Sequence, residues 1–439
     1  MKKAAVQICA LLRSILFIGF SIQILLGLAW LCTNFMEVQS FAPTGGQLYS
    51  LLMQMFGGVP QILYLLQLGA AFAAAYVLIK PYGRPGRFWR IWYVLAFMTF
   101  PMALQCHLAL LPHSFVSSLV LLELGFCRGI LKSEDGMSVA GLARAAACWL
   151  GLALLLPEYA WLGVIPPVLT VLLHLRQLCK HIRQLAYCII LIAAFGGMIA
   201  GLGSLASPEG KEGNRNTFWF SMACRTAWPR LWEDHTWWSE ELRALVKNVV
   251  WDTSNNPDNM EKIFRPTLEQ AVGEDQAQEY YREIAEVAWR LDKEQIVKQI
   301  VWDFLTYAAP TSVLQLQLSG RSYAFISGRN YEIMGMNTPR LTKYYVAYSC
   351  WWFFVALGST ALLAMSGCVA GERFVSLRKP ILPVVAVIWS VVIVCFYTMQ
   401  GAGIADYKYT IAVASLWSLF ALVVMGRGAC VEKDMYERE

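Results

Sequence analysis

Few ionisable side chains of this sequence lie where they could do chemistry, because most of the chain is apolar. Glu37 follows the first apolar run and is the only charged residue between Asn34 and Val59. Glu158 lies in a short connection between two later apolar runs. Ionisable groups near membrane depth are costly and tend to be functional. Each has an ordinary interpretation too, as a solvated loop carboxylate for Glu37 and a helix-capping acid for Glu158.

The five histidines do not form a metal-binding set by their spacing. Only His107 and His113 lie near each other, at the end of one apolar run and in the turn after it. This spacing predicts either a two-histidine metal site or, as the interpretation we favour, hydrogen-bonded histidines at the membrane interface. No metal and no cofactor is indicated, and the motifs of P-loop, serine-hydrolase, zinc-protease and C-x-x-C proteins do not occur.

Two further ionisable positions have structural interpretations. Glu123 lies inside an apolar run, where we expect it to pair with a basic residue such as Arg128 or Arg144. Asp406 and Lys408 lie in a late connection at a depth suited to a lipid phosphate, although an interfacial anchor explains them equally well.

The elements that must position these residues are membrane spans. Of the 439 residues, 57% are hydrophobic and 15% charged, against roughly a quarter charged in soluble domains. A bilayer core about 30 Å thick needs ~20 apolar residues per helix, and such runs recur along the chain. We therefore predict an all-α, multi-pass membrane protein with about ten transmembrane helices. The expected spans are 14–33, 60–79, 91–111, 115–131, 139–156, 159–173, 185–205, 348–368, 381–398 and 409–425.

Basic residues lie in alternate connections between these spans. The remaining short connections contain a single lysine, Lys408. By the positive-inside rule, both termini are cytoplasmic, and the first run is an uncleaved signal anchor because its apolar part is too long for a signal peptide. The outer segments contain no N-x-S/T sequon, which favours a bacterial plasma membrane.

Residues 206–343 are then outside the cytoplasm and hold most of the acidic residues of the chain. Apolar side chains recur at three-to-four spacing after Pro266, which predicts an amphipathic helix or helical hairpin that ends before Pro310. The segment 313–326 alternates like a strand or an extended segment. We expect a seven-helix module over 1–205, a mostly helical extracytoplasmic domain over 206–343, and three spans with a cytoplasmic tail over 344–439.

Tryptophan is frequent near the start of the outer domain, at Trp228, Trp232, Trp237 and Trp238. These rings could stack against sugars, or they could form an aromatic belt that lays the domain on the membrane surface. We favour the belt.

This layout resembles the membrane glycosyltransferases of the GT-C class, which use polyprenyl-phosphate sugars. The resemblance is one of plan and covers about residues 1–205. That class has an acidic residue in the first outer loop, a short juxtamembrane helix after it and a large outer domain after the seventh helix. Glu37, with glutamate where aspartate is usual, the segment 47–56 and the domain 206–343 occupy those places.

Two turns are similar to turns of the same class. The segment 154–159, Leu-Leu-Leu-Pro-Glu-Tyr, is similar to the basic-Pro-Glu turn between the fifth and sixth helices, with Leu156 in place of the basic residue. The segment 110–113, Leu-Leu-Pro-His, is similar to a Pro-Asp turn, with His113 in place of the acid. These departures bear on catalysis more than on fold.

The resemblance implies an inverting transfer in which Glu37 is the general base and the sugar leaves a lipid phosphate. Glu158, His107 and His113 would then contribute to substrate binding. The implied partners are membrane lipids, a polyprenyl-phosphate-linked sugar and an envelope glycan, lipid or protein acceptor, with no nucleic acid. The leaving phosphate needs cations at the outer face, and the eligible ones are Arg230, Arg321, Lys343 and Lys408.

Other functions fit the same pattern. Pro166-Pro167, Gly196-Gly197 and the glycines of 201–203 are expected to break helices, as transport pathways often do, which favours a non-catalytic transporter or a membrane scaffold for lipid or polysaccharide. No inverted repeat accompanies them. A polysaccharide polymerase or ligase would show a similar outer domain.

Overall fold

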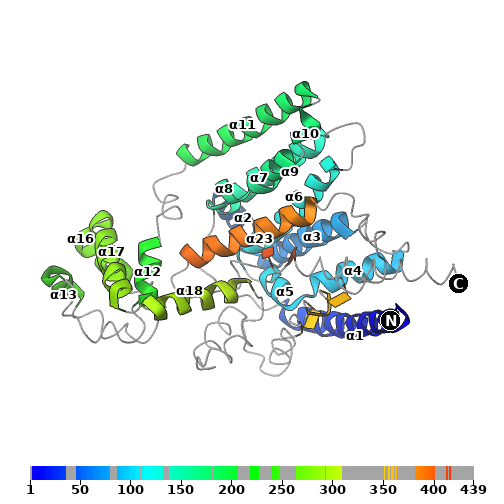
Figure 1. Cartoon of the computed structure of the whole chain (residues 1–439), viewed down its shortest axis with the longest axis horizontal. Helices are drawn as coiled ribbons and strands as arrows, with labels where there is room; N and C mark the ends of the chain where they lie inside the picture. The colour runs from blue at the N-terminus through cyan, green and yellow to red at the C-terminus, as the bar shows by residue number, and fades with distance from the viewer. Residues whose placement is uncertain are drawn as a thin grey trace. The chain divides into compact units, whose positions relative to one another are not determined.

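The protein is all-α over the part of the chain that the structure describes (Figure 1). In this computed structural model the described residues are 2–35, 46–79, 87–108, 110–131, 138–173, 175–179, 181–205, 218–226, 239–246, 264–291, 293–308 and 381–400, with short pieces within 351–362 and 412–416. The prediction of an all-α chain is confirmed for these residues.

Three of the described helices are long and apolar enough to cross a membrane. They are α1 (Lys2–Asn34), α3 (Pro60–Ile79) and α11 (Ile182–Leu205), whose apolar windows have 26, 19 and 21 residues. Shorter apolar helices include α6 (His113–Leu131), α7 (Val139–Leu155) and α23 (Ile381–Gln400). A set of apolar helices of this kind indicates a multi-pass membrane protein. The spans expected at 348–368 and 409–425 lie mostly outside the described residues.

The span expected at 91–111 is divided into two helices, α4 (Arg87–Met98) and α5 (Pro101–His107). Phe100 has an extended ψ of 124° instead of a helical one. Proline causes this break, because Pro101 has no N–H to donate and its ring excludes the residue before it from the helical region.

The span expected at 159–173 is likewise divided, into α8 (Tyr159–Leu162) and α9 (Ile165–Leu173). Pro166 and Pro167 remove two N–H groups that a continuous helix would need. The carbonyl of Leu162 instead accepts a hydrogen bond of 2.9 Å from the indole of Trp389 on α23. A residue late in the chain therefore satisfies a backbone group that the proline pair leaves open.

The glycines of α11 do not break it, contrary to the expectation for 196–197 and 201–203. The helix continues from Ile182 to Leu205, and Gly273 is the only described residue with a positive φ. In an apolar surrounding a helix keeps its backbone hydrogen bonds, so glycine without a conformational demand stays helical. Only 6% of its apolar window is buried within the chain.

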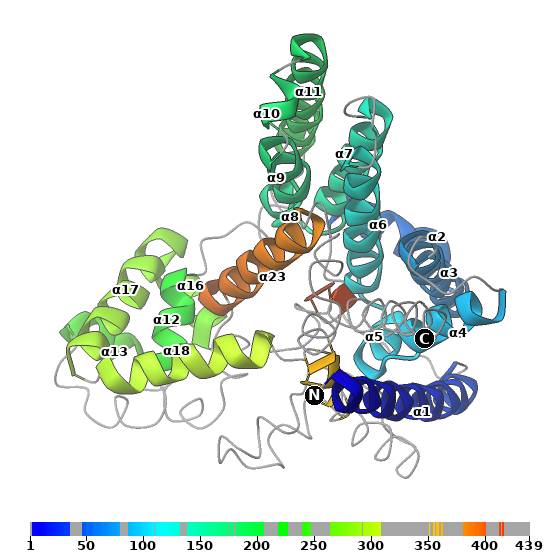
Figure 2. The same ribbon diagram turned by 45° about the vertical axis from the view of Figure 1, so that its right-hand side comes forward.

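Helices α3, α6 and α7 pack side by side (Figure 2). Gln67 near the start of α3 donates to Leu111 just before α6, and Leu78 at its end lies beside Gly125 of α6, so these two helices run parallel. Gly151 of α7 lies against Leu119 of α6. Because α7 runs back along α6, the turn after α7 lies at the same end as the turn before α6.

Helix α1 packs on α4 and α5 through polar as well as apolar contacts. The amide of Gln23 donates to the carbonyl of Ala96 at 2.6 Å, and Phe17 stacks on Trp92 with ring centroids 4.9 Å apart. A methyl group on Gly19 would overlap the ring of Trp351, so that position admits only glycine without a shift.

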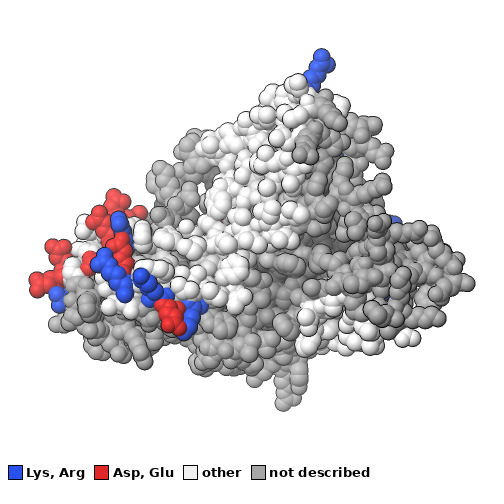
Figure 3. Space-filling view, in the orientation of Figure 1, with Lys and Arg blue, Asp and Glu red and all other residues white. Residues whose placement is uncertain are grey.

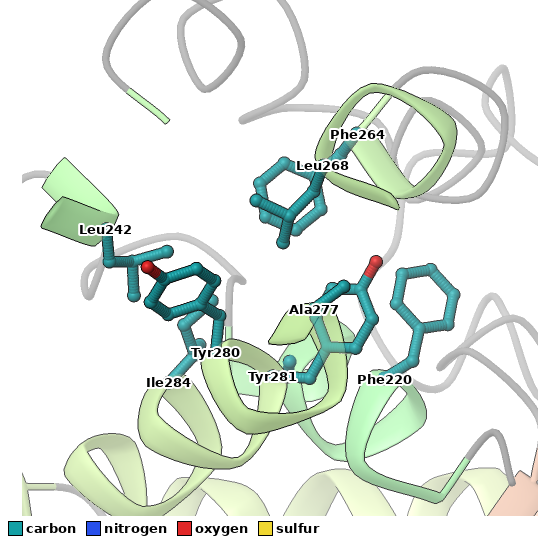
Figure 4. Close-up of a cluster of buried hydrophobic side chains, with 9 residues drawn as sticks. Phe220, Leu242, Phe264, Leu268, Ala277, Tyr280, Tyr281 and Ile284 are labelled. Atoms are coloured by element: carbon teal, nitrogen blue, oxygen red, sulfur yellow. The ribbon is translucent and has the colours of Figure 1, made fainter. Parts of the chain in front are cut away.

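The chain divides into two compact units, the first comprising 1–214, 310–391 and 411–439, and the second 215–309 and 392–410. The described part of the second unit holds five further helices and the last turns of α23. Its helices are α12 (Phe218–Thr226), α13 (Glu240–Val246), α16 (Arg265–Val272), α17 (Glu274–Leu291) and α18 (Lys293–Ala308). Figure 4 shows its core, in which side chains from α12, α13, α16 and α17 converge.

The amphipathic helical pattern predicted after Pro266 is confirmed. Helix α16 begins beside that proline, α17 and α18 follow as neighbouring helices, and α18 ends at Ala308, before Pro310. Tyr281 and Ile284 point into the core, while charged side chains gather on the visible surface over α16, α17 and α18 (Figure 3). Not every apolar position is buried. The exposed apolar side chains of α18 are Val297, Val301 and Leu305.

Candidate functional site

Buried polar side chains gather where α2 (Gln47–Phe56), α3, α5 and the start of α6 meet. We call this set the polar cluster. Its members are Tyr49, Tyr64, Gln67, His107 and Ser114. His107 bonds to Ser114, Gln67 bonds to the turn between them, and Tyr64, one turn from Gln67 on α3, interacts electrostatically with Tyr49.

The closest polar contact of the cluster joins His107 and Ser114. Nδ1 of His107 and Oγ of Ser114 are 2.6 Å apart, and both side chains are buried. Nε2 of His107 makes no hydrogen bond to a described residue. If Nδ1 carries the proton and donates to Ser114, Nε2 keeps a lone pair that can accept a hydrogen bond from a substrate hydroxyl. His107 and Ser114 are therefore hydrogen-bonded to each other, and Nε2 of His107 is the atom of the pair that a ligand could bond to.

The turn that separates the two residues is fixed from α3. Helix α5 ends at His107 because Leu108 leaves the helical region, and α6 begins after Pro112, whose carbonyl accepts from Val116 at 3.1 Å. The amide of Gln67 donates to the carbonyl of Leu111 at 3.0 Å. This bond holds the turn on α3 and so keeps His107 and Ser114 together.

Two tyrosines extend the cluster toward α2. Tyr49 is fully buried, and its hydroxyl makes no hydrogen bond to a described residue. Burial, with a smaller contribution from the neighbouring Tyr64, raises the pKa of Tyr49 above its ordinary value. Its hydroxyl therefore remains a neutral hydrogen-bond donor throughout the physiological range.

The start of α2 is joined to the end of α7. The N–H of Gly46 donates to the carbonyl of Leu155 at 2.7 Å, and a methyl group on Gly46 would overlap the carbonyl of Leu154. Gly46 at the start of α2 therefore lies against the end of α7, just before the turn that carries Glu158. Tyr49 lies about one helical turn after Gly46 on α2. The contacts of Gly46 therefore connect the turn that carries Glu158 with the polar cluster.

Glu158 is not a side-chain cap. It occupies the N-cap position of α8 but has helical backbone angles, and its side chain makes no capping hydrogen bond. A capping side chain requires the residue to leave the helical region, which Glu158 does not do. Its side chain is half-buried. The structure therefore excludes a capping hydrogen bond from Glu158, although the carboxylate does lie at the N-terminus of α8, where a negative charge is favoured.

The other candidates from the sequence fall in two groups. His113 begins α6 and is buried beside Ser114. It forms no metal-binding group with other described histidines, cysteines or carboxylates. The remaining candidates, the tryptophans at 228, 232, 237 and 238 and the segment 313–326 lie outside the described residues. Those candidates are Glu37, Arg230, Arg321, Lys343 and Lys408.

Sequence reasoning missed Gln67, Ser114 and the two tyrosines. Their signal was present, because a polar residue inside an apolar run must find a partner or serve a function. Tyr64 and Gln67 are three residues apart and therefore lie on one face of α3. That spacing could have identified a polar face opposite the turn of His107.

A second buried polar position lies deeper in the bundle, at Glu123 of α6. Its carboxyl is fully buried, and neither oxygen makes a hydrogen bond to a described residue. The expected pairing with Arg144 is not seen, since Arg144 is exposed. The side chain of Arg128 is not described.

No protein-family model, curated protein or solved structure matches this chain. Any function must therefore be argued from the site itself.

Proposed function

We propose that this chain is a multi-pass membrane glycosyltransferase, which transfers a sugar from a polyprenyl-phosphate donor to an envelope glycan, lipid or protein acceptor. The observation that carries the proposal is the polar cluster. Burying polar groups costs several kcal/mol where they lack partners. Nε2 of His107 and the hydroxyl of Tyr49 make no hydrogen bond to a described residue, so we expect these two groups to serve a ligand. Neutral donors and acceptors of this kind suit the hydroxyl groups of a sugar.

The proposed topology has about ten spans, cytoplasmic termini and the domain 206–343 outside. Under that topology the turns before α6 and after α7 are both outer turns. The polar cluster and Glu158 then face the leaflet in which a polyprenyl-phosphate sugar would be used. Tyr307 of α18 packs on Tyr397 near the end of α23, with ring centroids 6.4 Å apart, which supports an outer position for that end of α23.

The proposed chemistry is a single displacement at the anomeric carbon. The Glu37 carboxylate takes the proton of the acceptor hydroxyl, the acceptor oxygen forms the new glycosidic bond, and the bond from the sugar to the lipid phosphate breaks with inversion. Arg230, Arg321, Lys343 and Lys408 are the candidates to neutralise the leaving phosphate. The polar cluster binds the sugar or the acceptor and orients it.

The first experiment tests the base. Cells that lack the native copy are complemented with wild type, Glu37→Gln or Glu158→Gln, and their envelope glycans and glycolipids are compared by mass spectrometry. Glu37→Gln keeps the size of the side chain but cannot accept a proton, so we expect a loss of ~10²- to 10⁴-fold in product formation. Glu158→Gln should retain part of the activity. An unchanged glycan profile with Glu37→Gln at normal protein level removes the catalytic assignment.

The second experiment tests the polar cluster. His107→Gln removes the basic nitrogen and is compared with His181→Gln, which changes an exposed histidine on the cytoplasmic side of the proposed topology. We expect loss of product with the first variant and wild-type product with the second. Equal amounts of product from both variants would show that the reaction does not require the polar cluster.

A transporter is the second candidate, and a specific observation favours it. Glu123 is a buried carboxyl without a described partner, and the break between α8 and α9 lies in a neighbouring segment. Ionisable groups and broken helices mark transport pathways. Retained glycans in the Glu37→Gln strain, together with altered export of a lipid or polysaccharide in a Glu123→Gln strain, would favour this candidate.

A further inference from the structure

Glu123 stands apart from the polar cluster and from the proposed reaction. It lies on α6 about two and a half turns from Ser114, and both α7 and α9 pack against α6. Cys127 follows it by one turn on the same face of α6, and Cys148 of α7 is close enough to interact with it electrostatically. Thr170 of α9 lies beside Cys127.

None of these neighbours can balance a negative charge. The two cysteines are neutral thiols, and the hydroxyl of Thr170 donates its proton to the carbonyl of Pro166 at 2.7 Å. Gly125 of α6 faces Leu78 and Val77 of α3 and lies about 200° around the helix from Glu123, so Glu123 is on the side of α6 away from α3. Neither carboxyl oxygen bonds to a described cation on α6, α7 or α9, and Arg144 of α7 is exposed.

A charged carboxylate at Glu123 would raise the free energy of the folded state. Moving an isolated charge from water into an apolar medium costs far more than the free energy that holds a typical fold together, so the group takes up a proton instead. The neutral acid is still a polar group with two oxygens, and it costs less.

We propose that Glu123 is a proton-binding site inside the membrane bundle, which holds its proton while α9 covers it and exchanges that proton with water when α9 moves away. The proton bonds to a carboxyl oxygen, and water is both its source and its acceptor. The junction of α8 and α9 has fewer backbone hydrogen bonds than a continuous helix, because Pro166 and Pro167 have no N–H to donate. The bonds that remain there run from Gly163 to Tyr159 and from Val168 to Val164, and the side chain of Trp389 donates to Leu162.

Proton binding at Glu123 is therefore linked to the packing of α9. The covered site binds the proton more tightly than the uncovered site, so protonation favours the packed position of α9 and release favours the open one. The same reasoning makes Glu123→Gln a mimic of the protonated state, because the amide is neutral and nearly isosteric.

The test is infrared spectroscopy of the purified full-length protein at neutral pH. A protonated carboxylic acid has a carbonyl band separate from those of carboxylates and amides. We expect a band that is present in wild type, absent in Glu123→Gln, retained at a shifted position in Glu123→Asp, and unchanged in Glu158→Gln. Transfer into D₂O should shift the wild-type band, because the proton exchanges. A missing band, or a band that ignores D₂O, overturns the proposal.

A chemical probe gives an independent readout. Hydrophobic carbodiimides react with protonated carboxyls in apolar surroundings, and peptide mass spectrometry locates the adduct. We expect an adduct on Glu123 that falls about tenfold for each pH unit above the midpoint of its titration, as the protonated fraction does. Labelling that is suppressed by added Na⁺ at fixed pH would show a metal cation in place of the proton and would overturn the assignment. Glu123→Asp keeps the test valid if Glu123→Gln does not fold.

Discussion

Replacing Gly46 by alanine should separate α2 from the end of α7. Gly46 has φ −73° and ψ −179°, which any L-residue can adopt, so the cost arises from space and not from the backbone. The added methyl group overlaps the carbonyl of Leu154, which is backbone and cannot rotate away. Moving α2 to relieve the overlap breaks the 2.7 Å hydrogen bond to Leu155. A lost hydrogen bond and an overpacked contact together cost about 2 to 4 kcal/mol.

Thermal unfolding of the detergent-solubilised protein measures this cost. Gly69→Ala is the matched control, because Gly69 lies inside α3 with open space at its β position. Alanine there should stabilise the helix by up to about 1 kcal/mol. The two glycine-to-alanine changes are thus expected to shift the unfolding temperature in opposite directions. A Gly46→Ala protein as stable as wild type would refute the close contact, and with it the link between the start of α2 and the turn of Glu158.

Three further results are expected. A single cysteine at Gly213 should react with a membrane-impermeant maleimide in intact cells, while one at Gly83 should not; the reverse pattern contradicts the proposed topology. Tyr49 binds its proton more tightly when folded, so stability should fall as pH rises above about 10, and more steeply in wild type than in Tyr49→Phe. A fluorophore at Val301, which is 51% exposed, should be quenched by lipid-borne quenchers, and one at Arg282 should not; equal quenching argues against membrane contact through α18.

The helices were predictable from the sequence because membrane spans depend on local composition. The span predicted at 60–79 has the same bounds as α3, and α23 extends the span predicted at 381–398 by only two residues. Prolines account for the errors. Pro101 and Pro166 lie inside runs that are apolar enough to count as continuous spans, but each divides its run into two helices.

The polar cluster could be predicted only in part, because its contacts join distant segments. His107 and His113 were identified by their proximity in the chain, whereas Gln67 and Tyr49 contribute through contacts that no local pattern contains. The expected pairing of Glu123 with Arg144 is not seen for a related reason. Proximity in sequence suggested an arginine, but Arg144 is exposed, and Cys127 lies one turn along α6 on the face of Glu123.

The hydrogen bond from Trp389 to Leu162 has a consequence for how the protein is made. The two residues are 227 positions apart, and the pair Ser117 and Ser415, whose hydroxyls are 2.6 Å apart, is separated by 298. A ribosome therefore delivers α8 and α9 to the membrane long before it has synthesised their donor. During that interval the Leu162 carbonyl must accept a hydrogen bond from another donor, such as water or the insertion machinery, because lipid tails have no donor. Early helices thus enter the bilayer as an unfinished assembly that only the last part of the nascent chain completes.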